Sequence, residues 1–118
     1  MPSLSRHDAT SAIDPVALSR FLARSRERLT QMQSLLPDHA RDVDARDVRR
    51  ILQWSREIAV GAEVAGLSRL SDAALDVEEL ADEGLRSTAD PALLAVRMNE
   101  LLRALGAQLD AASTPVLA

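Results

Sequence analysis

Aliphatic residues recur at spacings of three and four along four stretches of the chain, and this period constrains the fold more than any other feature. Such spacing places the residues on one face of an α-helix, whereas a half-buried strand would need strict alternation. Strands also favour aromatic side chains, and the aromatic fraction here is only 2%. The sequence therefore predicts an all-α protein with an aliphatic core.

Residues that begin and end helices separate the four stretches. Asp14-Pro15 and Asp90-Pro91 each precede a long periodic segment, and an aspartate followed by proline suits a helix start. Gly66 suits a helix end, because glycine readily adopts the left-handed conformation. These signals predict helices over residues 15–36, 45–65, 68–84 and 91–111.

Four amphipathic helices with short connections favour an antiparallel up-and-down four-helix bundle. A length of 118 residues suits one domain, and no linker divides the chain. We expect residues 14–112 to form the bundle, residues 1–13 to be a flexible segment or a short helix, and residues 113–118 to be a tail.

Composition excludes several classes of function. The chain has no cysteine, which rules out disulfides, zinc–thiolate sites and cysteine nucleophiles. No segment approaches the roughly 18 apolar residues of a membrane span, and the first 12 residues lack the apolar run of a signal peptide. The net charge of −4 argues against nucleic-acid binding. We therefore expect a soluble cytoplasmic protein that binds neither membranes nor nucleic acids.

The third predicted helix carries six acidic residues and no cation between them. They are Asp72, Asp76, Glu78, Glu79, Asp82 and Glu83. A di-metal site in a bundle needs histidines on facing helices, and no predicted helix contains one, so we expect no metal. The acidic face is then either solvated or matched to an arginine-bearing neighbour. Arg20, Arg24 and Arg28, spaced by four on the first helix, could supply that match or meet an acidic partner.

The outer side of the second helix combines apolar and charged residues. On a helical wheel it carries Gln53, Trp54, Arg56, Glu57, Val60, Gly61 and Val64. A solvated face is normally polar throughout, whereas apolar anchors within a charged rim are typical of protein-docking surfaces. The alternative is that this helix is central in the bundle and that its valines belong to the core.

The second and third helices also resemble the histidine-phosphotransfer (HPt) domains of bacterial phosphorelays. That family has the motif His-x-x-Lys-Gly, then Gly-Leu, then a helix rich in Leu, Ala and Glu. The similar stretch here runs from Arg56 through Gly66-Leu67 to Leu80, and the segments 44–50 and 13–18 resemble the family's helix starts. The resemblance implies a four-helix bundle that takes part in two-component signalling.

No alignment with the HPt motif supplies the phosphoacceptor histidine. If Gly66 sets the register, Arg56 occupies its place; if Gly61 does, Glu57 occupies it and Val60 replaces the lysine. If Arg56 is the basic residue of the motif, Gln53 stands there. Phosphohistidine chemistry needs a nucleophilic ring nitrogen, which none of these side chains has. The resemblance therefore implies a non-catalytic regulator that docks a response-regulator receiver domain or a sensor kinase through its second helix.

The sequence leaves two alternative functions open. The chain could be an active phosphotransfer protein that uses His7 or His39, both of which lie outside the predicted helices. It could also be a structural homodimer that pairs through the Trp54–Val60–Val64 side. A Gly-rich phosphate loop and a nucleophile elbow are both absent from the sequence, so we expect no catalytic residue and no cofactor.

Overall fold

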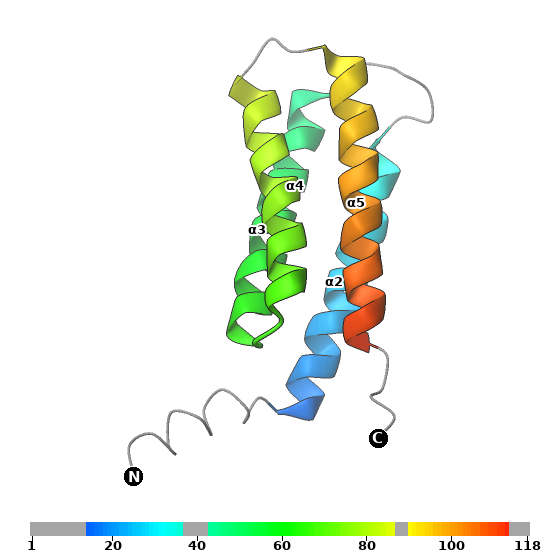
Figure 1. The fold of residues 1–118 in the computed structure, drawn as a ribbon. Coiled ribbons are helices and arrows are strands. Elements are labelled where there is room, and N and C mark those ends of the chain that lie inside the picture. Colours follow the sequence, from blue (N-terminus) through cyan, green and yellow to red (C-terminus); the bar gives the residue numbers. More distant parts are fainter. Residues whose placement is uncertain (1–13, 37–42, 87–89, 114–118) are drawn as a thin grey trace.

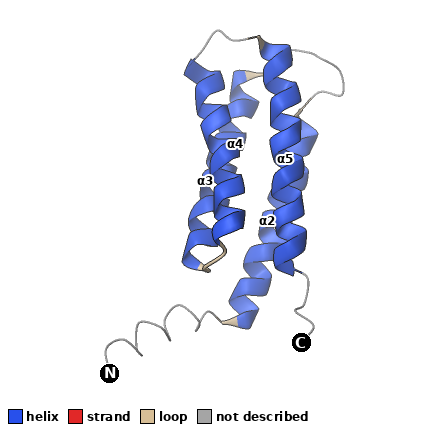
Figure 2. Cartoon of the chain, viewed as in Figure 1, coloured by secondary structure: helices blue, strands red, loops and turns tan. Residues whose placement is uncertain are grey.

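The computed structural model describes residues 14–36, 43–86 and 90–113. These residues form four α-helices and contain no strand (Figure 2). The helices are α2 (Pro15–Leu35), α3 (Ala45–Val64), α4 (Ser68–Arg86) and α5 (Pro91–Ser113). The predicted all-α class is thus confirmed. The expected N-terminal segment, His7, His39 and residues 114–118 lie outside the described residues.

Successive helices run in opposite directions, as in an up-and-down bundle (Figure 1). In this view α4 and α5 lie in front, with α3 and α2 behind them. The α3–α4 contact is the most extensive and the α2–α3 contact the least, with α4–α5 and α2–α5 between them. Hence α2 and α4 lie diagonally across the bundle.

Three helices begin at an aspartate that caps the first turn. The Oδ1 atom of each accepts a hydrogen bond from the backbone N–H two residues later, at 2.9–3.0 Å. The three are Asp14, Asp44 and Asp90. Such a bond satisfies one of the N–H groups that the first turn leaves without an intrahelical partner.

The turn from α3 to α4 depends on Gly66. Its φ angle of +77° lies in the left-handed region, where a side chain would add strain. The Leu67 N–H donates to the Ala62 carbonyl at 2.8 Å, and the Gly66 N–H donates to the Glu63 carbonyl at 3.0 Å. This paired arrangement is a Schellman motif, so the helix stop predicted at Gly66 is confirmed.

The core is aliphatic, as the sequence predicts, and all four helices contribute to it. Its largest fully buried hydrophobic residues are Met32, Ile51, Leu70, Val77, Met98, Leu102, Leu105 and Leu109. Three serines of the described residues, Ser25, Ser55 and Ser71, are buried among them. Ser71 on α4 donates its hydroxyl to the Ala59 carbonyl of α3 at 3.0 Å. That bond ties α3 directly to α4.

Helices α4 and α5 both extend past their predicted ends, to Arg86 and Ser113. Gly84 was expected to end α4, but it lies inside the helix. A Cβ atom at Gly84 would lie only 2.8 Å from Leu94 Cδ2, so the glycine lets α5 approach closely. An ion pair between Arg86 and Asp82 at 3.1 Å joins the last turns of α4.

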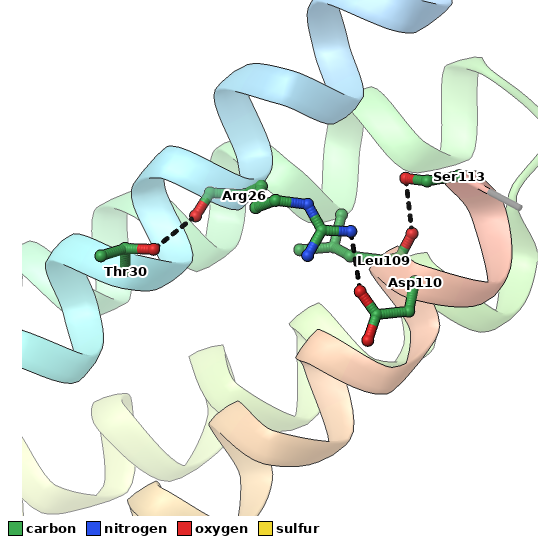
Figure 3. A network of polar contacts seen from close by, with 5 residues as sticks. All are labelled: Arg26, Thr30, Leu109, Asp110 and Ser113. Atoms are coloured by element: carbon green, nitrogen blue, oxygen red, sulfur yellow. Dashed lines mark hydrogen bonds and ion pairs between the residues drawn. The ribbon is translucent and has the colours of Figure 1, made fainter.

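A surface network connects α2 to α5 (Figure 3). The Arg26 Nη2 atom lies 2.8 Å from Asp110 Oδ1. Beside this pair, Thr30 donates its hydroxyl to the Arg26 carbonyl and Ser113 donates to the Leu109 carbonyl. Both charged side chains are largely exposed, so the pair stabilises the fold by no more than about 1 kcal/mol.

None of the helices in the described part of the chain has the length and apolar character needed to cross a membrane.

Candidate docking surface

The outer face of α3, defined here as Gln53, Arg56, Glu57, Val60 and Val64, is open to solvent. Val60 is 57% exposed and Val64 is 76% exposed, although both are aliphatic. The alternative that these valines belong to the core is therefore wrong. Exposed apolar side chains among charged ones form a surface that a protein partner can cover with a gain in free energy.

Trp54 and Gly61 lie at the edge of this face, where α3 meets α2, and both are partly buried. The aromatic ring of Phe21 on α2 lies directly against Gly61. A Cβ atom at that glycine would overlap the ring, whose Cδ1 lies 3.0 Å from the Cβ position. Gly61 therefore provides the space that Phe21 occupies.

A groove of about 600 Å³ runs between α2 and α3 beside this contact. Its apolar part is formed by Phe21, Ile58, Val60 and Gly61. Its polar lining consists of Arg24, Ser25, Arg28, Gln53, Arg56 and Glu57. The groove thus joins the outer face of α3 to residues of α2 that the sequence did not assign to the site.

Arg28 forms part of the groove wall and also covers the only tryptophan. Its guanidinium carbon lies 5.1 Å from the centroid of the Trp54 ring, within the range of a cation–π interaction. The Nη1 atom donates a hydrogen bond to Gln31 Oε1 at 3.1 Å. These two contacts orient the guanidinium while it still lines the groove.

Of the three candidate acceptor positions, the two charged ones, Arg56 and Glu57, differ in their surroundings. Arg56 donates from Nε to Glu78 Oε1 at 3.3 Å, which joins α3 to α4. Glu57 lies in the groove lining, is exposed, and forms no ion pair with any residue of the described segments. On the α3 side of the groove, Arg56 is therefore engaged with a neighbouring helix, whereas Glu57 has no ion-pair partner among the described residues.

Charge is divided between diagonal helices. Helix α2 has four arginines and one glutamate, whereas α4 has six acidic residues and two arginines. The sequence left open a match of the α4 acids with Arg20, Arg24 and Arg28. It is not formed within the described segments, because α2 and α4 are not neighbours. Within those segments, the ion pairs of the two helices are instead Arg26 with Asp110, Glu78 with Arg56 and Asp82 with Arg86.

The acidic face of α4 is solvent-exposed at Asp72, Asp76, Glu79 and Glu83. Over residues 14–36, 43–86 and 90–113, no three histidine or carboxylate side chains come close enough to hold a metal ion.

Comparison of the chain with protein-family models, with curated proteins and with solved structures finds no match in any of the three. The assignment of a function therefore rests on the exposed face of α3 and on the groove beside it.

Proposed function

We propose that this chain is a non-catalytic HPt-like module that binds a response-regulator receiver domain or a sensor kinase through the outer face of α3. The observation that carries the proposal is the exposure of Val60 and Val64 within a ring of charged and amide side chains. Binding energy at protein interfaces comes mostly from a few apolar or aromatic anchors surrounded by a polar rim. Val60 is the central anchor, because it borders both the exposed face and the groove.

The residues on this face support the proposed absence of transfer chemistry. The residues that occupy the acceptor place in the three possible registers are Gln53, Arg56 and Glu57, and none provides an imidazole nitrogen. Arg56 is engaged by Glu78, and Glu57 presents a negative charge to solvent. A module of this kind would occupy a receiver or a kinase without passing on a phosphoryl group.

The binding test uses receiver domains and kinases from the same genome, purified one by one and titrated with the chain in a calorimeter. With a partner found in this way, Val60→Asp should weaken binding by about tenfold or more, because it places a charge at the anchor. Val96→Asp is the matched control, since Val96 is 49% exposed but lies on α5. Equal weakening by the two variants, or no binding to any receiver or kinase, would contradict the proposal.

The chemical test exposes the chain to a small phosphodonor and to phosphorylated receivers, with the intact mass measured afterwards. We expect no phosphoryl group on the chain. Incorporation that disappears in a His39→Ala or His7→Ala variant would instead establish an active phosphotransfer protein.

A further inference from the structure

We infer that the groove between α2 and α3 receives the acidic face of α4 from a second copy of this chain. The inference goes beyond the proposed function and does not depend on it. It rests on two surfaces of one molecule that complement each other in charge and in apolar content and that cannot meet within that molecule.

The groove offers an apolar floor with a basic border. Phe21, Val60 and Gly61 contribute apolar surface, and Arg24 and Arg28 lie along the α2 side. The α3 side carries Arg56 and Glu57, so arginines outnumber carboxylates in the lining by three to one. Arg24 is exposed and forms no ion pair within the described residues. An occupant that fits would present an apolar side chain flanked by carboxylates.

Helix α4 presents that combination at Leu75. This leucine is 45% exposed on a helix whose other large aliphatic residues turn inward. Asp72 and Glu79 lie three residues before it and four after it, so both share its face. Asp76 is adjacent, and all three carboxylates are exposed. An aliphatic side chain among carboxylates on α4 thus matches an apolar groove bordered by arginines.

The geometry of the bundle decides that the contact is between molecules. The groove lies between α2 and α3, and α4 lies diagonally from α2 (Figure 1). The α4 residues Asp72, Asp76 and Glu79 are exposed to solvent. Each associated pair would still have one groove and one acidic face unoccupied. Association of this heterologous type continues into rings or open chains instead of stopping at a symmetric dimer.

Self-association would also regulate the outer face of α3. Glu57 and Val60 line the groove, so a second copy seated there covers residues proposed to meet a receiver or kinase. Partner binding and self-association are then mutually exclusive. At higher concentrations of the chain, a smaller fraction of its molecules can bind a receiver or kinase.

Sedimentation velocity on the whole chain tests the inference without any partner. The weight-average mass should rise with concentration up to about 1 mM, a range that detects weak contacts. The association should weaken by about tenfold or more between ionic strengths of about 0.02 M and 0.5 M, because salt screens exposed charges. A chain that stays monomeric throughout overturns the inference and leaves the proposed function standing.

Two variants separate this contact from any other. Arg24→Glu alters the groove but keeps the acidic face, and Leu75→Arg alters the face but keeps the groove. Each variant alone should remain monomeric, whereas an equimolar mixture should form 1:1 dimers that grow no further. Controls are Arg103→Glu and Val96→Arg, two exposed positions on α5 that should associate like the unmodified chain.

A mixture that stays monomeric, or variants that associate like the unmodified chain, would overturn the inference. A closed dimer that survives both variants and is lost in Val64→Asp would identify a symmetric pairing through α3 instead. Circular dichroism of each variant verifies that the helices are intact, so that loss of association is not loss of folding.

Discussion

Helix α3 packs against two neighbours in different ways. Its contact with α4 is the most extensive in the bundle, and the Ser71 hydroxyl reaches the Ala59 carbonyl across it. Its contact with α2 is the least extensive of the four helix pairs and includes the groove. On that side the two helices meet through the long side chains of Phe21 and Arg28, which cover Gly61 and Trp54.

The difference comes from side-chain size. Alanine and serine at the α3–α4 contact let two backbones approach until a hydroxyl of one helix bonds a carbonyl of the other. A phenylalanine ring and an arginine hold α2 further away, and the space beside them is the groove. Because its contact with α4 holds α3 in the bundle, α3 can expose the side beside the groove to a partner without a change in the fold.

The largest effect on stability should come from adding side-chain volume to the α3–α4 contact. Ala59→Leu should lower the free energy of unfolding by about 1–3 kcal/mol, because an overpacked contact must shift backbone or rotamers. Ala59 is 3% exposed, whereas its neighbour Val60 lies on the solvent-exposed outer face of α3. Val60→Leu should change stability by no more than about 0.5 kcal/mol. Urea unfolding measures the stability of both variants. Equal losses of unfolding free energy would contradict the distinction between the tightly packed α3–α4 contact and the exposed outer face of α3.

The hydrogen bond between α3 and α4 should have a smaller effect. Ser71→Ala should cost about 0.5–1.5 kcal/mol, the usual net value of one such bond. Ser34→Ala is the matched control, because Ser34 also donates to a backbone carbonyl but is exposed and bonds within α2. If Ser71→Ala lowers the free energy of unfolding no more than Ser34→Ala does, the buried hydrogen bond does not stabilise the α3–α4 contact.

Gly61→Ala tests whether the Phe21 ring at the α2–α3 contact can move to accommodate an added methyl group. Alanine favours a helix over glycine by about 1 kcal/mol, but the new methyl group would overlap Phe21. Because the ring can move toward the groove, we expect a net change of less than about 1 kcal/mol in either direction. In a Phe21→Ala background the same substitution should stabilise by the full amount of about 1 kcal/mol. Identical effects in the two backgrounds would mean that the ring does not oppose the methyl group.

A comparably small effect concerns Arg28 and Trp54. Arg28→Gln should cost about 0.5–1 kcal/mol, the value of an exposed cation–π contact, and should change the emission of the only tryptophan. Arg24→Gln removes a neighbouring charge that does not cover the ring, so its emission spectrum should match that of the unmodified chain. Matching spectra for both variants would contradict the stacked arrangement.

The sequence predicts the helices well because their ends depend on local chemistry. Aspartates at positions 14 and 90 and the glycine at position 66 act through bonds to residues close by in the chain. The end of α4 was misplaced because Gly84 serves a distant residue, Leu94, which local patterns cannot indicate. The burial of Ser71 was missed for the same reason, since its acceptor belongs to another helix.

The outer face of α3 could be predicted from one helical wheel, because amphipathicity on a single helix shows which residues point away from the core. The groove could not, since it depends on which helix lies beside α3 and how closely. The position of Phe21 over Gly61, for example, follows only from the packing of two helices. The sequence also left open whether Arg24 and Arg28 pair with α4, because sequence patterns do not specify which helices are diagonal.

Backbone amide shifts during a titration test the central claim most directly. The chain, labelled with ¹⁵N, is titrated with a receiver domain or kinase that binds it. The account predicts that the largest shifts fall on Gln53, Glu57, Val60 and Val64, while the signals of Val96 and its neighbours on α5 stay in place. Largest shifts on α5, or on α4 with the α3 signals unchanged, would contradict it.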